Sequence, residues 1–314
     1  MLRFVAFRIL HMIPVFIGIS LVMFVLVRVV PGDPAVVALN VYATPERVTQ
    51  LRAVWGLDKP ILVQYGIFLS QLLHGDLGYS YFYRQPTLVL VLERLGPELF
   101  LVVYVVVLTL LVAIPLGALA ATHRDGVADN LVRALMIGGL SLPAYWVGII
   151  LLLVFGIWIP IFPVGGYGGT FLEHLRSLFL PATTIALGLT TLVIRALRAS
   201  MIETLEADHV DMARSKGLPR FTVLRRHVFR PALIPAVTVL GINVGLLIGG
   251  TVIVEFVFGI PGLGQLMITA ISTRDYPTVV AVTLAFAVFV MFVNLLTDVL
   301  VAFLDPRARA AMAG

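Results

Sequence analysis

Residues 205–235 read LEADHVDMARSKGLPRFTVLRRHVFRPALIP, a charged stretch that lies between two strongly apolar runs. Its first part places acidic residues ahead of Arg214 and Lys216, the charge order that favours a helix with a partly positive N-terminus. Gly217 follows at the position where such a helix would end. A second basic segment comes after Pro219. We therefore expect a helix, a glycine turn and a second short helix, exposed to a soluble partner.

The composition around this stretch is that of a membrane protein. Of the 314 residues, 60% are hydrophobic and only 12% are charged, about half the charged fraction of an ordinary soluble domain. The chain has no cysteine, which excludes a disulfide framework, a thiolate metal site and a cysteine nucleophile. The net charge of +5 does not require a nucleic-acid partner, because membrane topology accounts for an excess of basic residues.

Six apolar runs are long enough to cross a membrane, which takes about 20 helical residues. These runs are 9–30, 99–121, 134–159, 178–194, 232–258 and 279–304. Six spans place both termini on one side, and the segments on that side hold 14 of the 22 Lys and Arg residues. The two short outer loops hold only Arg176 and Arg274. Because short cytoplasmic loops retain positive charge, we predict an all-α integral membrane protein with both termini in the cytoplasm.

This topology divides the chain into four parts. They are the N-terminus with the first, retained membrane helix (1–30), a long extracytoplasmic loop (31–98), a transmembrane core (99–304) that includes the cytoplasmic loop 195–231, and a cytoplasmic tail (305–314). The extracytoplasmic loop has Gly and Pro at turn positions and an amphipathic stretch at 61–74. We expect it to fold against the outer face of the membrane core.

Short motifs along the whole chain carry a resemblance to a known family. Residues 211–217, Asp-Met-Ala-Arg-Ser-Lys-Gly, resemble the acidic-Ala-Ala-three residues-Gly signature of permease subunits in bacterial ABC importers, with Met212 in place of the first alanine. Other motifs are similar, in order and spacing, to those of the first permease subunit of dipeptide, oligopeptide and nickel importers. They are PGDP (31–34), GLDKP (56–60), GDLGYS (75–80), GIPGLG (259–264), RDYP (274–277) and LDPR (304–307).

The resemblance implies a type I ABC importer permease fold in the bacterial cytoplasmic (inner) membrane. It also implies four kinds of partner: a second homologous permease, two cytoplasmic ATPase subunits, an extracytoplasmic solute-binding protein and membrane lipid. In such a complex the ATPase subunits would bind ATP and Mg, and loop 205–230 would dock on them and move as a lever. The docking residues implied are Asp211, Ala213 and Gly217, with the basic residues Arg214, Lys216, Arg220, Arg225 and Arg226 beside them.

The sequence offers no chemistry of its own. It lacks the Gly-x-x-x-x-Gly-Lys-Ser/Thr loop that binds ATP phosphates. Its six histidines show no paired metal-ligand spacing, and no Ser/His/Asp arrangement can be placed in one aqueous pocket. We therefore expect a translocation subunit rather than an enzyme, with no catalytic residue, no metal or cofactor of its own, and no nucleic-acid partner.

Ionisable residues in membrane runs are costly and often mark a transport path. Arg28 and Asp298 lie close to the ends of their runs, where interfacial anchoring is the preferred interpretation. Two roles stay open for Glu255: a structural ion pair and a contact at a gate. The glycines of 241–250 recur at every fourth position around Asn243, which favours close helix approach, either within this chain or to a partner or path. Asn243 and Glu255 are the candidate path residues.

The substrate and the class of transporter stay open at this stage. A dipeptide, a longer peptide, glutathione and a nickel complex are all compatible with the resemblance. A stand-alone secondary carrier or channel would need no ATPase, but it would be expected to have mid-membrane charges. A structural or receptor-like membrane protein would explain the charged loop but not the kinked, glycine-rich helices.

Overall fold

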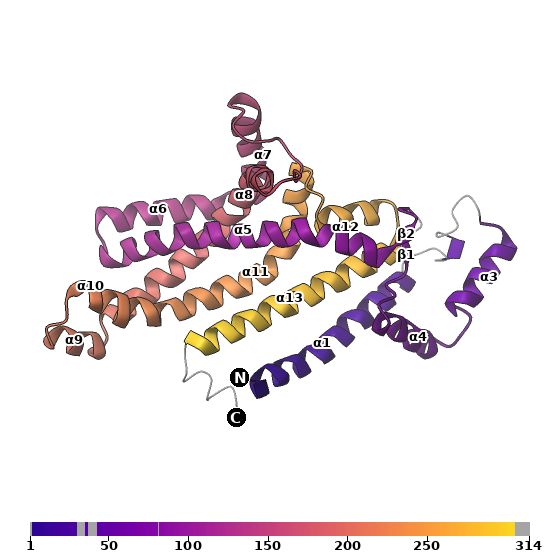
Figure 1. Ribbon diagram of the computed structural model, residues 1–314, viewed down its shortest axis with the longest axis horizontal. Helices are drawn as coiled ribbons and strands as arrows, with labels where there is room; N and C mark the ends of the chain where they lie inside the picture. The colour runs from indigo at the N-terminus through magenta and orange to yellow at the C-terminus, as the bar shows by residue number, and fades with distance from the viewer. Residues whose placement is uncertain (1, 30–34, 37–42, 81, 305–314) are drawn as a thin grey trace. The chain divides into compact units, whose positions relative to one another are not determined.

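The computed structural model describes residues 2–29, 35–36, 43–80 and 82–304, and almost all of its regular structure is helical (Figure 1). The PGDP motif, most of the LDPR motif and the predicted tail lie outside these residues. The chain divides into two compact units. Unit 1 comprises Met1–Arg8, Leu99–Ile260 and Val290–Gly314, and unit 2 comprises Ile9–Glu98 and Pro261–Phe289.

Unit 1 contains the longest run of consecutive helices. It begins within α5 (Thr87–Thr122) and ends with α11 (Arg230–Phe258), and the last part of α13 (Tyr276–Leu304) also belongs to this unit. Between α5 and α11 lie α6 (Val127–Ser141), α7 (Ala144–Leu152), the π-helix η2 (Leu153–Trp158), α8 (Phe171–Leu205), α9 (Asp208–Ser215), α10 (Arg220–Thr222) and the π-helix η3 (Val223–Phe229).

Helix α8 is the core of unit 1. It packs along α11 and α6, and a stretch of its residues from Ser177 to Met201 is largely buried. Small residues on the neighbouring helices allow close approach: a Cβ atom added at Gly139 of α6 would lie 2.8 Å from Thr191 Oγ1 of α8. A capping box between Thr170 and Glu173 starts α8 before its apolar run, because it satisfies backbone donors of the first turn.

Unit 2 combines the segments predicted to be extracytoplasmic with parts of long apolar helices. It contains α1 (Leu2–Val29) from Ile9 onward, α3 (Pro45–Trp55), α4 (Ile61–Leu73), the antiparallel strands β1 (Tyr79–Ser80) and β2 (Gln85–Pro86), and α12 (Leu263–Ser272), with the adjoining parts of α5 and α13. Leu90 and Val91 of α5 pack with Leu263 and Leu266 of α12 in one buried cluster. The amphipathic stretch noted at 61–74 forms helix α4, which ends at Leu73.

Motifs that lie far apart in the sequence are in contact within unit 2. Gly78 of the GDLGYS motif has a φ of +92°, and a Cβ atom there would lie 3.2 Å from Pro277 Cβ of the RDYP motif. The backbone N–H of Leu263, in the GIPGLG motif, donates to Glu98 Oε2 over 3.2 Å. Because Leu263 begins α12, this carboxylate satisfies a donor at a helix N-terminus.

The prediction that this is a helical membrane protein is confirmed, while the predicted number of six membrane spans is not decided. In the described residues, five helices are long and apolar enough to cross a membrane, and two bent helix pairs would raise the number to as many as seven. Six spans therefore stay a prediction. The boundaries differ from the apolar runs: the second helix begins at Thr87 rather than Leu99, and the third run is broken after Ser141, at Leu142 and Pro143. Proline cannot continue a helix without losing a hydrogen bond.

Candidate functional site

Loop 205–230 begins where α8 ends, and its first element is the eight-residue helix α9. Val210 and Ala213 of α9 are buried, with 0% and 5% exposure, while Met212 between them is 60% exposed. The first turn carries Asp211 and the last turn carries Arg214. This is the charge order expected from the sequence, and it complements the helix dipole.

A glycine turn ends α9, as the sequence predicts. The N–H of Gly217 donates to the Arg214 carbonyl over 2.9 Å, and the N–H of Leu218 donates to the Ala213 carbonyl over 3.4 Å. This pair of bonds is the Schellman arrangement, which requires a left-handed residue after the helix. Gly217 supplies it with a φ of +74°. The buried Ala213 thus contributes both its methyl group and its carbonyl to the turn.

The segment after the turn differs from the prediction. Instead of a separate second short helix, Arg220 starts a helical stretch that passes through η3 and continues into α11. The π-helical hydrogen-bond pattern of η3 lies directly before Pro231, which has no N–H to donate. The prediction of a second helix that ends before the apolar run was therefore wrong: α11 extends into the loop.

Several side chains of the loop point into solvent. The exposed apolar ones are Met212, Leu218 and Phe221, and Phe221 is 71% exposed. Arg214, Lys216 and Arg220 are exposed beside them. Underneath, Val223 and Val228 of η3 are buried, and α9 packs against η3. The loop is thus a compact structure that presents apolar and cationic side chains together.

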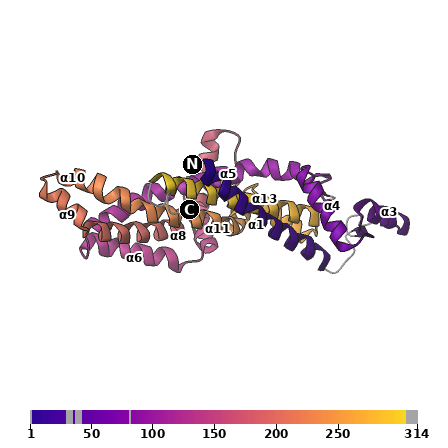
Figure 2. The same ribbon diagram turned by 90° about the horizontal axis from the view of Figure 1, so that it is seen from below.

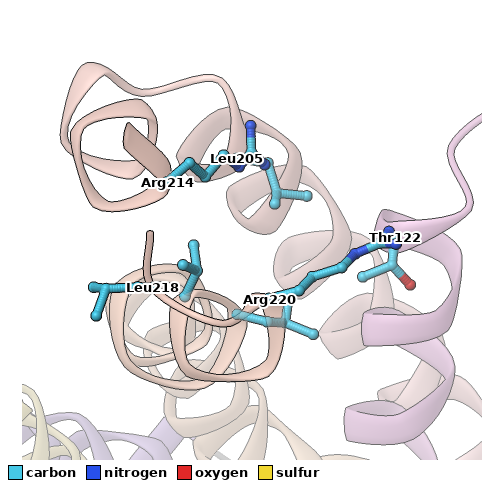
Figure 3. Close-up of a pocket in the computed structure, with 7 residues that line it drawn as sticks. Thr122, Leu205, Arg214, Leu218 and Arg220 are labelled. Atoms are coloured by element: carbon cyan, nitrogen blue, oxygen red, sulfur yellow. The ribbon is translucent and has the colours of Figure 1, made fainter. Parts of the chain in front are cut away.

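A cavity of about 510 Å³ lies at the base of the loop (Figure 3). Its walls are the side chains of Leu205, Leu218, Val223, Leu224, Thr122, Arg214 and Arg220. The side chain of Arg220 extends toward Thr122 at the end of α5 (Figure 3). The end of α5 therefore lies next to loop 205–230, and the sequence did not indicate this proximity.

The candidate path residues lie elsewhere on α11 and are not brought together with the loop. Asn243 Nδ2 donates to the Val239 carbonyl of its own helix over 2.8 Å. Glu255 is fully buried near the other end of α11. At 1.5 Å per residue, these two positions are about 18 Å apart along the helix axis. Both assignments to a path stay predictions.

The glycine stripe of α11 has two different environments. A Cβ atom at Gly241 would lie only 2.1 Å from Thr297 Oγ1 of α13, and one at Gly245 would lie 3.5 Å from Val290 of the same helix. At Gly249 and Gly250, no described atom lies within 4 Å of the Cβ position. The first two glycines thus serve helix packing within this chain, while the last two are open.

The charged residues at the ends of two membrane helices have partners within the chain. Arg28 donates to Gln64 Oε1 over 2.6 Å and 3.1 Å, and its guanidinium lies 3.4 Å from the centre of the Phe24 ring. Asp298 pairs with Arg8 over 3.1 Å. Both residues therefore have structural roles. Within the described ranges, no three His, Asp or Glu side chains are grouped so that they could hold a metal ion.

Two buried carboxylates were missed from the sequence. Glu98 was placed in the outer loop, and Asp129 was placed in a short cytoplasmic connection, but each is essentially inaccessible to solvent. Asp129 accepts two hydrogen bonds from Arg198, 69 positions away. No local pattern indicates such a partner, because it lies on another helix far along the chain.

Known proteins match this chain along most of its length. A family described as "Binding-protein-dependent transport system inner membrane component" matches residues 113–310. A second description, for the N-terminal part of such membrane components, matches residues 1–101. The chain belongs to this family. It is therefore an inner-membrane component of a transport system and not an enzyme, as the sequence predicts.

Named relatives cover almost the whole chain. The dipeptide transport system permease protein DppB of Escherichia coli (strain K12) is 35% identical over 336 residues, covering 98% of this chain and 99% of DppB. A protein of Brucella abortus (strain 2308), named for a peptide transport system permease, is 38% identical over 306 residues, covering 96% of this chain and 97% of the relative. The predicted resemblance to peptide importer permeases is confirmed.

Proposed function

We propose that this chain is one permease subunit of an ATP-driven, binding-protein-dependent importer of dipeptides or longer peptides. Full-length similarity to permeases named for peptide and dipeptide transport supports the substrate class. The single observation that supports ATP coupling is loop 205–230, a compact helix and Schellman turn that presents apolar and cationic side chains on the predicted cytoplasmic side.

The connections of the loop suit the transmission of movement. Only Glu206 and Ala207 separate α9 from α8, and after the turn the chain continues without interruption through η3 into α11. Figures 1 and 2 both place α9 and α10 beyond the ends of these two helices. A partner that displaces α9 would therefore pull on α8 and α11 together, and these helices pack against each other along much of their length.

The docking roles follow from the exposure of each side chain. Met212 and Phe221 would insert into an apolar cleft of the ATPase, with Asp211, Arg214, Lys216 and Arg220 forming polar contacts at its edge. Ala213 and Gly217 would act indirectly, since they form the buried side of α9 and its turn. This refines the sequence-based assignment, which places Asp211, Ala213 and Gly217 together at the contact, with the basic residues beside them.

The remaining partners complete the importer. A second, homologous permease would form the translocation path with this chain, with Asn243 and Glu255 as candidate path residues. An extracytoplasmic solute-binding protein would deliver the peptide, and two ATPase subunits would bind ATP and Mg. A nickel complex or glutathione stays an alternative substrate, and a stand-alone secondary carrier stays the alternative mechanism.

Reconstitution tests this function. The chain is co-expressed with its genomic neighbours, purified and placed in proteoliposomes, and uptake of labelled dipeptide is measured with and without ATP and the binding protein. We expect uptake to require both. Solute flux through this chain alone, without ATP, would instead indicate a carrier.

A matched pair of variants tests the docking surface. Phe221→Ala removes an exposed ring from the loop, whereas Phe303→Ala removes an equally exposed ring, at 71% and 73% respectively, from the end of α13. We expect Phe221→Ala to lose about tenfold in ATPase affinity, as an aromatic interface anchor does, and Phe303→Ala to retain it. Equal retention of the ATPase by both variants contradicts docking at this surface.

A further inference from the structure

The carboxylate of Asp129 is the most completely enclosed charge near the loop. It is 0% exposed and accepts hydrogen bonds from four donors. Arg198 Nε and Nη2 contact Oδ1 and Oδ2, each over 2.7 Å, while Arg133 Nη2 and the Asp125 N–H reach Oδ2 over 2.7 Å and 2.9 Å. A two-pronged arginine–carboxylate contact fixes geometry as well as charge.

The two arginines have different structural consequences. Arg133 lies one turn from Asp129 on the same helix, α6. Arg198 lies on α8, two turns before this helix ends and the chain leads into α9. The contact with Arg133 therefore neutralises charge within α6, whereas the contact with Arg198 joins α6 to the helix that carries the loop.

A second ion pair joins the same parts of the chain. Arg124, in the turn between α5 and α6, contacts the carboxylate of Glu206, the residue that directly follows α8. The turn itself is held in shape by Asp125, whose φ is +60° and whose N–H points to Asp129. The α5–α6 turn is thus attached to α8 at two positions, one buried and one at the surface.

Close packing removes free space between these helices. A Cβ atom at Gly117 of α5 would lie 3.0 Å from Leu197 of α8, and one at Gly139 of α6 would lie 2.8 Å from Thr191 of α8. Figure 2 shows α6 running beside α8 toward the end where α9 lies. Helices in such contact slide little without a discrete rearrangement, because packed interiors deform poorly.

We propose that Asp129 and Arg198 are positioning residues that lock the α5–α6 turn to α8, so that displacement of α9 moves α5, α6 and α8 as one body. This inference rests on the proposed function, because α9 is displaced only if an ATPase docks there. Without the lock, the last two turns of α8 would bend away from α6, and movement of the loop would be lost before it reached the membrane helices.

The alternative is that the arginines only neutralise a buried charge. In that case the loss would follow the positive charge that is removed, so R133Q and R198Q would cause comparable losses, and R198K, which keeps the charge, would behave as the wild type. The test therefore compares R198Q with R133Q in the reconstituted complex. R198K serves as the conservative variant, since it keeps the positive charge but not the two-pronged geometry.

Three quantities are measured for each variant: the amount of assembled complex, ATP hydrolysis stimulated by the binding protein, and dipeptide taken up per ATP hydrolysed. We expect R198Q to assemble and hydrolyse ATP but to lose about tenfold in uptake per ATP, the scale of coupling changes produced by single substitutions. R198K should fall between R198Q and the wild type, and R133Q should match the wild type. Equal losses for R198Q and R133Q would overturn the proposal.

A cross-link provides the second measurement. In the R124C/E206C chain, a short bifunctional thiol reagent would tie the α5–α6 turn to the end of α8. If these parts move as one body, the cross-linked complex should transport at the rate of the uncross-linked one, and the link should restore uptake per ATP to R198Q. Loss of transport on cross-linking means that the parts move relative to each other and overturns the proposal, even where R198Q fails to assemble. A wild-type complex without ATP-dependent uptake would refute the proposed function instead.

Discussion

Ser80 of the β1–β2 hairpin donates its hydroxyl to the carboxylate of Asp275, 195 positions further along the chain. Both residues are buried, and Thr278 donates to the same oxygen of Asp275 over 2.7 Å. Ser80 Oγ in turn accepts the N–H of Tyr83 over 3.0 Å. The GDLGYS and RDYP motifs thus belong to one polar site, which holds the β1–β2 hairpin to the start of α13.

Because Asp275 accepts from both Ser80 and Thr278, removing Asp275 should lower the stability of the chain more than removing the Ser80 hydroxyl. Ser80→Ala leaves Asp275 with Thr278 as a donor, while Asp275→Ala leaves two buried hydroxyl groups without their acceptor. We expect Asp275→Ala to lower the free energy of unfolding by about 1–3 kcal/mol and Ser80→Ala to lower it less. Thermal unfolding of the purified chain measures both, with the exposed Ser272→Ala as control. An Asp275→Ala chain as stable as this control would contradict the site.

Substitutions of Gly217 should impair coupling because of its backbone conformation and not because of steric contacts with neighbouring atoms. No described atom lies within 4 Å of its Cβ position, but its φ is +74°. A β-branched residue in this conformation costs about 1–2 kcal/mol, so Gly217→Val should uncouple ATP hydrolysis from uptake while leaving the amount of inserted chain unchanged. Gly217→Asn is the control, because asparagine tolerates left-handed φ values. Normal uptake and ATPase stimulation with Gly217→Val would mean that the turn does not matter for coupling.

Gly241 predicts a packing defect between α11 and α13. An alanine methyl group there would lie 2.1 Å from Thr297 Oγ1, and overpacking of this kind costs about 1–3 kcal/mol. Gly241→Ala should therefore lower the melting temperature of the chain in detergent, and Gly249→Ala, at an open position, should not. Thr297→Ala removes the two closest atoms, Oγ1 and Cγ2, but keeps Cβ, 2.6 Å from the methyl position. Partial recovery of stability in the Gly241→Ala/Thr297→Ala chain would identify this contact as the cause, whereas equal stability of Gly241→Ala and Gly249→Ala would contradict it.

Glu98 predicts a helix-terminus effect at α12. Its Oε2 accepts the N–H of Leu263, the first residue of α12. Glu98→Ala removes this acceptor in a buried site and should cost about 1–3 kcal/mol in the free energy of unfolding. Glu98→Gln keeps an acceptor oxygen and should cost less. Limited proteolysis between α11 and α12 would detect the loosened helix start, and identical cleavage of all three chains would refute the role.

The sequence predicts features that are encoded by neighbouring residues. The turn at Gly217 depends on the charge order of residues 208–216 and on one glycine, and it is confirmed. The amphipathic stretch at 61–74 is visible in the sequence because its pattern is continuous, and it corresponds closely to helix α4. The class of the protein follows from composition and motif order, which summarise the whole chain.

The sequence fails where distant residues decide the structure. Helix α5 begins at Thr87 because Leu90 and Val91 pack against α12, more than 170 positions later. The helical stretch that leads into α11 begins inside the loop at Arg220, because η3 joins α10 to α11 without a break, whereas the sequence predicted a separate short helix. Asp129 is an ordinary loop residue in the sequence and becomes a buried acceptor only because α8 brings Arg198 to it.

The seven-residue η3 fixes the rotation of α11 about its own axis. Each residue of an α-helix turns the chain by about 100°, and a π-helical segment takes up additional residues without lengthening the helix correspondingly. Deleting one residue between Val223 and Phe229 can therefore be absorbed by a return of this segment to α-helical geometry. Deleting one residue just after it, at the start of α11, would instead turn the loop by about 100° relative to Asn243 and the glycines that pack on α13. The segment η3 thus sets which face of the fifth apolar run meets its neighbours for a given position of the loop.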